Sequence, residues 1–576
     1  MKRIISFILA LIFALIMLIP FSAYATDVHS QDIELRADQL ASDAYKFIEN
    51  SLKYAKNNAN DKNPITITLP SGTYYLSKCL HIYSNTNLVL QKDTVIIKDF
   101  EDGNMLKCGI KDEKNSGYNG YRNISVSGGI WDEAFNGDSC GMRFAHCSNV
   151  SLKNVTIKNN KNSHHIELAA ADNFSIINCT FSGYKRTNSA DGMAVQIDTM
   201  HYYSHFPDYY NYDDTPCRNI TVKGCTFDNV YAGVGPYSGV IGSYFDKIVI
   251  KSNTFKNIKD KAISAFNYVN STIYNNNIDG ATIGILFEYY PFEKLTNRFY
   301  KPYSSSSVNI INNSNTKIKG NTINVVKSSG RTNSCGIAVY GGALSAKNAK
   351  SYGLIQGKYF IENLEISKNT VNVKSNASSG IILSYLNNST VYKNTVRDLT
   401  ASSGNGLVFK HSQLNTVSSN IVNKFTNSIA LSASSAGNLI RNNTLKNAFG
   451  FGIKADSTSS VKIEYGNIFK KNKGGAIQLK EKKFKPKEIT VQNLKVSGKT
   501  VSWDKELKIS GYKVFRSTKK TKGYVEIATI IGKKYTSFTD TTAEKGKKYY
   551  YKIAVFKSFN KTQINGAYSE YVQIKY

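Results

Sequence analysis

The segment ITVKGCTF, residues 220–227, decides the fold because close variants of it recur through the middle of the chain. Each variant alternates apolar and polar residues and then runs into Asn or Cys, Thr and an apolar residue. The variants are FSIINCTF (174–181), IVIKSNTF (248–255), TKIKGNTI (316–323), LEISKNTV (364–371), STVYKNTV (389–396) and NLIRNNTL (438–445). Such self-similarity is typical of solenoid proteins, in which each repeat stacks on the one before.

Aligning the repeats gives one column of short polar residues, separated mostly by about 23 to 28 residues. The column contains Asn154, Cys179, Cys225, Asn253, Asn276, Asn321, Asn369, Asn394, Asn420, Asn443 and Asn467. This spacing fits one coil of a parallel β-solenoid, with three short strands and three turns. Stacked coils place equivalent residues about 4.8 Å apart, so amides in one turn can hydrogen-bond up the stack. We therefore expect Asn369, Asn394 and Asn420 to be vertically aligned.

With this repeat, residues 35–480 resemble the pectate-lyase-like right-handed parallel β-helix proteins. An amphipathic helix is expected around residues 45–55, before the strand pattern ITITLPSGTYYLS at 65–77. The resemblance implies that this helix, in an N-terminal cap of about 35–77, covers the open end of the solenoid and blocks edge pairing. The fold hosts lyases, hydrolases, epimerases and inert adhesins, so it leaves the activity open.

The composition changes after EKKFKPKE (481–488). The segments at 499–520 and 535–556 resemble a fibronectin type III β-sandwich, with Trp503 in its core and residues 549–555 as a central strand. The predicted fold class is therefore all-β: a right-handed parallel β-helix over 26–484, then a small sandwich over 487–576. We interpret the sandwich as a spacer or wall-associating module that folds around its own core.

The first 25 residues have the pattern of a signal peptide. Lys2 and Arg3 precede an apolar run at 4–18, and Ala23-Tyr24-Ala25 is a small-x-small cleavage site. No later segment offers the roughly 20 continuous apolar residues of a membrane span. We therefore expect a secreted, extracellular protein that associates with the cell wall, does not insert into a membrane and is a monomer.

The net charge of +31 suits an anionic partner. We expect a polysaccharide or cell-wall glycan, acidic ones included. No segment matches a nucleic-acid-binding motif, and export also argues against a nucleic-acid partner. Eight cysteines in an exported chain allow disulfides, but the spacing assigns no pairing.

Candidate functional residues lie on the strand that follows the longer turn of each coil, as in GMRFA (141–145), HIELA (165–169) and AVQID (194–198). Because strand side chains alternate, the residues between the apolar positions face outward. The outward positions are Arg143, His165, Glu167, Gln196, Asp198, Tyr237, Phe266, Glu288, Tyr340 and Lys410. They predict a polar strip on the outer face of one parallel sheet.

Glu167 and Asp198 suggest a first catalytic hypothesis. They lie on adjacent coils, two positions apart along the strand, which puts them about 8 Å apart. A separation of ~6.5–9.5 Å suits a glycoside hydrolase with one carboxyl as acid and the other as base. His165, Asp191 and Tyr237 are further catalytic candidates. We expect Glu167→Gln and Asp198→Asn each to slow turnover by at least ~10²-fold, with folding nearly unaffected because both side chains face outward.

Three long loops, at 199–217, 290–307 and 341–360, leave the same edge of this sheet and should form one wall of a groove. Their tyrosines offer flat platforms for sugar rings. The predicted substrate contacts are Arg143, Gln196, Tyr209, Tyr210, Phe266, Glu288, Tyr340 and Lys410.

Two alternatives to hydrolysis stay open. A β-eliminating lyase would need a cation and a base, for which Arg143, His165, Tyr237 and Lys410 are the candidates. Calcium is admitted as a cofactor only for the lyase, and no metal ligand is assigned. The sequence departs from polygalacturonase-like motifs, of which NSADG (188–192) and GIKAD (452–456) are poor echoes, so no family's catalytic residues carry over. The other alternative is a non-catalytic adhesin or glycan-binding protein that uses the same groove.

Overall fold

A computed structural model describes residues 32–576 except 111–112, 189–191, 208, 238, 290–298, 304–309, 327–333, 375–378, 401–403, 465, 480–481, 485–490, 508 and 560–561. The predicted signal peptide and Asp191 lie outside the described residues. Within the described part of the chain, no helix is long and apolar enough to cross a membrane.

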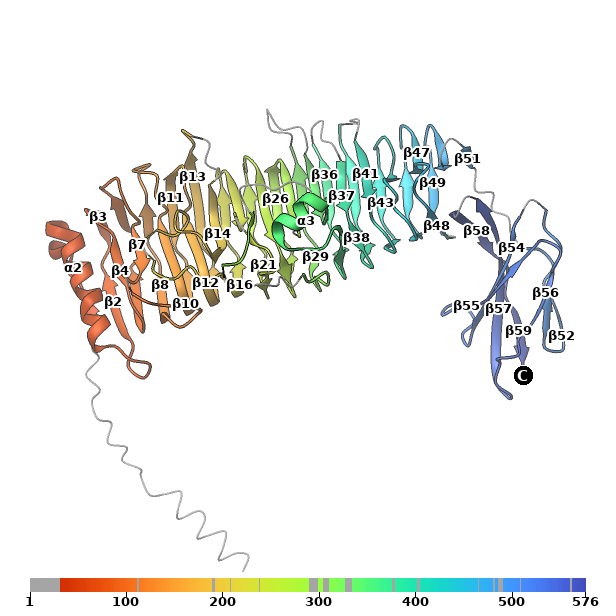
Figure 1. The fold of residues 1–576 in the computed structure, drawn as a ribbon, viewed down its shortest axis with the longest axis horizontal. Helices are drawn as coiled ribbons and strands as arrows, with labels where there is room; N and C mark the ends of the chain where they lie inside the picture. Colours follow the sequence, from red (N-terminus) through yellow and green to blue (C-terminus); the bar gives the residue numbers. More distant parts are fainter. Residues whose placement is uncertain are drawn as a thin grey trace, which may run out of the picture.

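Three long parallel sheets run along a β-helix, which is followed by a β-sandwich (Figure 1). We call them the first, second and third sheets in the order in which a coil passes through them. The first sheet contains β4 (Leu80–Ile82), β7 (Leu106–Cys108), β10 (Met142–Lys153), β12 (Ile166–Ile177), β14 (Met193–Met200), β18 (Ala232–Gly235), β23 (Lys261–Phe266), β27 (Ile283–Glu288), β31 (Cys335–Tyr340), β37 (Ser379–Ser384), β41 (Asn405–Lys410), β44 (Ile429–Ser432), β47 (Phe451–Ala455) and β50 (Gly475–Leu479).

Strands β10 and β12 bend from the first sheet into the second, so their C-terminal halves belong to the second sheet. The bends fall at His146 and Ala170, which have φ of 49° and 46°. The other strands of the second sheet are β2 (Ile65–Leu69), β5 (Thr86–Leu90), β8 (Tyr121–Ser127), β16 (Arg218–Lys223), β21 (Val249–Lys251), β25 (Thr272–Tyr274), β29 (Lys317–Lys319), β35 (Glu365–Ser367), β39 (Thr390–Tyr392), β42 (Thr416–Ser418), β45 (Asn438–Arg441) and β48 (Val461–Ile463).

The third sheet has 14 strands. They are β3 (Gly72–Leu76), β6 (Thr94–Lys98), β9 (Ile130–Asp132), β11 (Thr156–Lys161), β13 (Thr180–Lys185), β17 (Thr226–Asp228), β22 (Thr254–Lys256), β26 (Asn277–Ala281), β30 (Thr322–Val325), β36 (Thr370–Val373), β40 (Thr395–Asp398), β43 (Ile421–Asn423), β46 (Thr444–Lys446) and β49 (Ile468–Lys470). Inward side chains of the three sheets form one continuous core, in which like residues stack. Phe181, Phe227 and Phe255, for example, have ring centroids 5.0 and 4.6 Å apart.

The predicted asparagine column is a buried hydrogen-bonded ladder. The backbone N–H and the Nδ2 of Asn369 both donate to Oδ1 of Asn394, each at 3.0 Å. Asn394 donates in the same way to Asn420, at 2.9 Å. The pattern continues to Asn467, and it begins where the Cys225 N–H donates to Asn253 Oδ1. The predicted vertical alignment of Asn369, Asn394 and Asn420 is confirmed.

The place given to Asn154 in this column is wrong by one residue. Thr156 pairs with Thr180, so Val155 and not Asn154 stands beside Cys179. Asn154 is exposed, with a φ of 55°. It occupies the left-handed corner just before the column, a position that Asn178 and Gly224 fill in the next two coils. Asparagine and glycine tolerate this conformation better than other residues, so Asn is common at both adjacent positions.

Helix α2 (Ala37–Asn58) covers the N-terminal end of the solenoid, as predicted, but it is longer than the expected segment. Its buried face includes Leu40, Ile48 and Leu52, which pack against the core of the first coils. Strand β1 (Ile33–Glu34) pairs with β2. Because helix α2 lies over the first coil, little of its sheet edge is left for pairing with another chain.

Shorter elements belong to loops and corners of the coils. They are β15 (Thr215–Pro216), β19 (Gly239–Val240), β20 (Phe245–Asp246), β24 (Tyr268–Val269), β28 (Phe299–Tyr300), β32 (Gly342–Leu344), α3 (Ala346–Tyr352), β33 (Gly357–Tyr359), β34 (Ile361–Glu362) and β38 (Leu386–Asn387). Strand β51 (Lys482–Phe484) folds back antiparallel on β50.

The C-terminal region is a two-sheet sandwich around its own core, in which the ring centroids of Trp503 and Tyr512 are 5.2 Å apart. One sheet holds β52 (Lys495–Ser497), β53 (Thr500–Ser502) and β56 (Ser537–Thr539). The other holds β54 (Gly511–Ser517), β55 (Val525–Ile531), β57 (Lys548–Phe559), β58 (Thr562–Tyr568) and β59 (Val572–Lys575). Strand β57 is central, as predicted, because it pairs with β54, β58 and β59.

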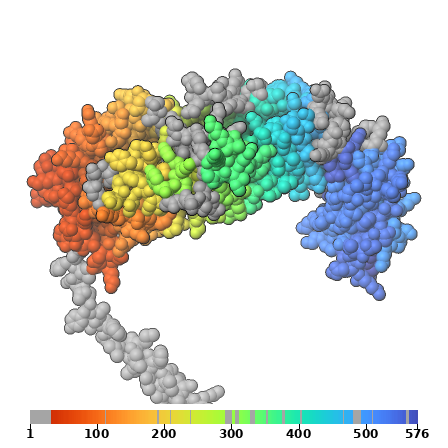
Figure 2. All heavy atoms as spheres, viewed as in Figure 1, coloured from red at the N-terminus to blue at the C-terminus, as the bar shows by residue number. Residues whose placement is uncertain are grey.

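The sandwich also touches the solenoid through strand pairing. Strand β58 pairs in parallel with β48 of the last coils, with Ile463 opposite Ile564. Ile564 packs against the solenoid core. Figure 2 shows the sandwich projecting from the end of the solenoid.

Candidate functional site

The loop at 199–217 lies against the outer face of the first sheet because small residues stand there. Ala145 and Ala169 project outward, next to Arg143 and Glu167 on β10 and β12. Phe206 and Met200 are fully buried against these alanines. The Phe206 ring also lies 5.6 Å from the Arg143 guanidinium carbon. The loop therefore covers the first-sheet face at Ala145 and Ala169. It leaves Arg143 and Glu167, two residues earlier on the same strands, accessible from one side.

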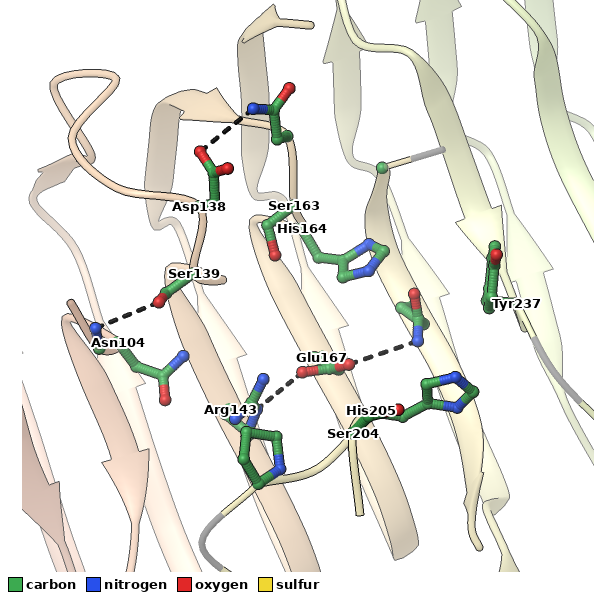
Figure 3. A pocket seen from close by; sticks show the side chains of 15 residues that line it. Asn104, Asp138, Ser139, Arg143, Ser163, His164, Glu167, Ser204, His205 and Tyr237 are labelled. Atoms are coloured by element: carbon green, nitrogen blue, oxygen red, sulfur yellow. Dashed lines mark hydrogen bonds and ion pairs between the residues drawn. The ribbon is translucent and has the colours of Figure 1, made fainter. Parts of the chain in front are cut away.

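A pocket of about 450 Å³ remains beside the loop. Its floor is formed by Arg143, Glu167 and Gln196, which lie on successive strands of the first sheet (Figure 3). The turns before β7, β10, β12 and β14, the loop at 199–217 and Tyr237 after β18 form its walls. The wall residues are Gly103, Asn104, Asp138, Ser139, Asn162, Ser163, His164, Gly192, Ser204, His205, Pro207 and Tyr237.

Glu167 is the centre of a buried polar network. Arg143 Nε donates to Glu167 Oε2 at 2.7 Å, and Gln196 Nε2 lies 3.4 Å from Glu167 Oε1. Figure 3 marks the interaction between Arg143 and Glu167 with a dashed line. Glu167 is 3% exposed and Arg143 is 9% exposed. A buried ion pair of this kind fixes both side chains, because either charge alone would be costly to bury.

Asp198 lies next to this floor but does not line the pocket. It is 0% exposed and accepts hydrogen bonds from Gln196 Nε2 at 2.6 Å and from the Tyr237 N–H at 3.0 Å. The nearest carboxyl oxygens of Glu167 and Asp198 are at most about 6 Å apart, because 3.4 and 2.6 Å separate them from the same nitrogen. The Gln196 amide occupies the gap in which an inverting hydrolase would hold its water.

The interpretation that His165 faces outward is wrong. His165 is 1% exposed, its Nε2 lies 3.1 Å from the Ser182 carbonyl oxygen, and its ring packs edge-on against Phe181 in the core. Strand β12 begins only at Ile166, so the alternation does not extend back to His165. Burial lowers the pKa of His165 to about 4. His164 lines the pocket instead.

Two histidines line the pocket, and their burial favours the neutral imidazole. Burial lowers the pKa of both His164 and His205. His164 Nδ1 lies 2.9 Å from the Met193 N–H, so it accepts that hydrogen bond. The His205 ring is edge-on to Tyr237, with centroids 5.9 Å apart. With Nδ1 of His164 already accepting, its Nε2 carries the proton and can only donate to a bound molecule, whereas a neutral His205 can accept a hydrogen bond or a proton.

An aromatic cluster extends from His205 along the loop. Tyr202 stacks on Tyr300 at 5.5 Å, and His201 stacks on Tyr303 at 4.3 Å. His201 also pairs with Asp214, whose other oxygen accepts the Tyr303 N–H. The loops at 199–217 and 290–307 therefore meet over their described residues. Of the three loops, only the loop at 199–217 contributes to the described pocket lining, with Ser204, His205 and Pro207, so the single wall predicted from three loops comes from one.

Most of the predicted substrate contacts lie elsewhere. Tyr209 packs on Phe206 and donates its OH to the Cys108 carbonyl oxygen at 3.4 Å, so it holds the loop down. Tyr210 is exposed beside Lys114. The pocket lining also lacks the strand-end residues of the later coils, Phe266, Glu288, Tyr340 and Lys410. Phe266 is buried, Glu288 and Tyr340 are half-buried, and Lys410 is exposed.

The predicted residues that do meet in the pocket are Arg143, Glu167, Gln196 and Tyr237. The sequence interpretation missed Asn104, Asp138, Ser163 and His164, which lie in the turns just before the first-sheet strands. Extending the coil alignment back into these turns would have identified them. The described residues include no group of three or more His, Cys, Asp and Glu side chains that could hold a metal ion.

Comparisons with known proteins agree on the fold. Residues 306–496 match the family model described as a right handed beta helix region. The chain is 24% identical over 251 residues to the plasmin and fibronectin-binding protein A of Streptococcus pneumoniae. That match spans 37% of this chain and only 34% of the curated relative.

Two solved structures are also similar. The Streptococcus pneumoniae surface protein and adhesin PfbA is 17% identical, with a TM-score of 0.51 over 69% of this chain and 96% of that chain. The tailspike protein of E. coli bacteriophage HK620, solved with a pentasaccharide, is 12% identical, with a TM-score of 0.43 over 92% of this chain and 88% of that chain. The similarity to PfbA is one of fold. Together with the family match, it assigns the chain to the right-handed parallel β-helix class.

Proposed function

We propose that this protein is an extracellular or surface glycan-binding protein, and that the pocket over β10, β12 and β14 holds a saccharide unit. The observation that carries the proposal is the preformed polar floor of Arg143, Glu167 and Gln196. Sugars present hydroxyl groups that both donate and accept, and this pocket offers both kinds of partner. Tyr237, His205 and the adjoining Tyr202 supply the flat apolar surfaces on which sugar rings pack.

Gln196 lies in the pocket floor in a fixed orientation. Its Nε2 lies between two carboxyl groups, which fixes the orientation of the amide. Its Oε1 is buried and has no hydrogen-bond partner. A buried acceptor without a partner is costly, and a ligand hydroxyl that reached it would remove that cost.

The name of the streptococcal relative supports a surface-binding role. That protein is called a plasmin and fibronectin-binding protein, and its solved structure is described as a surface adhesin. We infer that this chain is likewise exported, through the signal peptide at 1–25. We also infer that residues 487–576 form a fibronectin type III-like module, because two sheets enclose a separate core there.

The test is glycan-array screening of the full-length protein, followed by calorimetry on the best ligand. His205→Ala removes a pocket wall without breaking the buried network, and we expect it to weaken binding at least 10-fold. Tyr210→Ala is the matched control, because Tyr210 is exposed outside the pocket and its loss should leave affinity within about twofold. Equal losses in both variants, or none in His205→Ala, would place the glycan elsewhere.

Polysaccharide cleavage in the same pocket is the second candidate. The observation in its favour is that His205 lines the pocket together with Arg143, where burial lowers the pKa of the imidazole and favours the neutral form that can serve as a base. Hydrolysis by Glu167 and Asp198 is less favoured, because Gln196 stands between their carboxyl groups. Reducing-end release would support hydrolysis, and an ultraviolet-absorbing unsaturated product would support elimination. Binding without either product leaves the protein as a glycan-binding protein.

A further inference from the structure

The outer face of the C-terminal sandwich carries aromatic rings and lysines together, far from the pocket. On β57 the alternation sends Tyr549, Tyr551, Ile553 and Val555 into the core. The intervening Lys548, Tyr550 and Lys552 therefore project from the opposite face. A single exposed tyrosine needs no explanation, but aromatic rings gathered on one exposed face mark an interaction site.

Neighbouring strands and loops extend this face. Lys552 Nζ lies 5.0 Å from the Tyr524 ring and 5.7 Å from the Tyr568 ring. Lys520 Nζ lies 5.3 Å from the Tyr571 ring, which is edge-on to Tyr550 at 5.7 Å. The tyrosines are half-buried, and Lys520 and Lys548 are exposed. We call these seven residues, Lys520, Tyr524, Lys548, Tyr550, Lys552, Tyr568 and Tyr571, the tyrosine–lysine face.

The face has a net positive charge. Glu526, on the same side of β55, is 2.7 Å from Lys513 Nζ and is neutralised by it. The three lysines of the face have no such carboxylate partner among the ion pairs of the described residues. Residues 487–576 hold 19 Lys and Arg against 7 Asp and Glu, so the surroundings are also positive.

The face is accessible from solvent. Strand β57 approaches the solenoid at its C-terminal end, where Lys557 pairs with Ile564 of β58. Tyr550 is seven residues earlier on the same strand, about 20 Å away at the rise of an extended chain. A long polymer can therefore lie across the face without meeting the solenoid.

We propose that the tyrosine–lysine face binds an anionic polysaccharide. Its lysines would contact carboxylate, sulfate or phosphate groups, and its tyrosines would pack against the sugar rings between those groups. This site is independent of the pocket on the first sheet. It would attach the sandwich to an anionic glycan while the pocket stays free for a different saccharide.

The test measures binding of the full-length protein to immobilised polymers. Heparin and a wall teichoic acid represent the two sources of anionic glycan, host and bacterial, and dextran is the uncharged control. We expect the triple variant Lys520→Gln, Lys548→Gln and Lys552→Gln to bind the preferred polymer at least 10-fold more weakly. The matched control changes Lys495, Lys505 and Lys533, which are exposed outside this face, to Gln. It removes the same charge and should lose less than threefold.

The aromatic part is tested separately, with polyglutamate as a polyanion without sugar rings. Tyr550→Leu with Tyr571→Leu keeps bulk and charge. We expect this variant to bind the anionic glycan at least fivefold more weakly and polyglutamate as before. Equal losses in the two lysine triples would overturn the site, because the whole charge would then be responsible. Equal losses on glycan and polyglutamate in the tyrosine variant would overturn its assignment to sugars.

Discussion

Replacing Glu167 by Gln should destabilise the protein substantially, although the side chain projects from the outer face of a sheet. The substitution keeps the shape but removes the negative charge that faces Arg143 at 2.7 Å. Counted without the backbone, the side chain of Glu167 is 4% exposed and that of Arg143 is 11% exposed, so both are largely buried. The new amide could still accept from Arg143, but its NH₂ would then face the NH₂ of Gln196. If Gln196 turned over to avoid this, it would lose its hydrogen bond to Asp198.

Breaking a buried ion pair by removing one partner costs about 3–5 kcal/mol. That is a large part of the roughly 5–15 kcal/mol by which folded domains are stable. Sequence alone predicted a change within ~0.5 kcal/mol, as for an exposed residue. We expect a loss of about 3 kcal/mol in urea unfolding followed by circular dichroism. Glu101→Gln, at an exposed carboxylate, is the control and should stay within ~0.5 kcal/mol.

A double-mutant cycle checks the physical reason. The double variant Arg143→Gln with Glu167→Gln removes both charges. Its loss in free energy of unfolding should therefore be smaller than the sum of the losses of the two single variants, by at least ~1 kcal/mol. A loss of less than ~1 kcal/mol for Glu167→Gln would refute the reasoning, as would strict additivity in the cycle. In either case the ion pair would be open to water in solution.

Three further predictions concern the scaffold. Asn394→Ala removes the hydrogen-bond partners of the Asn369 N–H and the Ile366 carbonyl, and should lower the free energy of unfolding by about 2–5 kcal/mol in the same assay. The control Asn442→Gly, at an exposed left-handed corner, should lower it by less than ~0.5 kcal/mol. Similar losses in the two variants would mean that the asparagine ladder contributes little to stability. The pKa of His165 is about 4 in the folded protein and about 6.5 in the unfolded chain, so the free energy of unfolding should fall by up to about 3 kcal/mol as the pH is lowered from 6.5 to 4. His165→Gln should flatten this pH dependence, and an unchanged profile in the variant would contradict the prediction. Deleting residues 485–576 should leave the solenoid folded but increase amide hydrogen exchange in β48, which loses its partner strand β58, and in β45, which pairs with β48. Complete loss of soluble protein would show instead that the sandwich is needed for folding.

The sequence predicted the fold well because the repeat acts locally and is restated in every coil. The Asn-Thr signal occurs many times, so one misaligned member such as Asn154 does not alter the deduced architecture. Alternation along β12 also placed Glu167 on the correct face. Both inferences rest on the periodicity of short strands, which neighbouring coils reinforce.

The site was harder to predict because it depends on what covers the sheet. Alternation gives a direction for Asp198 but not its burial beneath Gln196 and the backbone of Tyr237. It also fails outside the strand, as for His165, one residue before β12 begins. The role of Tyr209 depended on the path of a loop that carries no repeat. Neither pattern nor composition encodes how such a loop lies on the sheet.

The pairing of β58 with β48 gives the two parts of the molecule a second point of attachment. A module joined by a single linker would swivel freely, whereas here the chain is attached both through the backbone and through a strand in the second sheet. Nine successive strand pairings separate β14, on the floor of the pocket, from β50 at the C-terminal end of the first sheet. At the spacing of hydrogen-bonded strands this is a rod of about 40 Å. If the sandwich were bound to a surface, the solenoid would therefore hold the pocket at a distance from that surface.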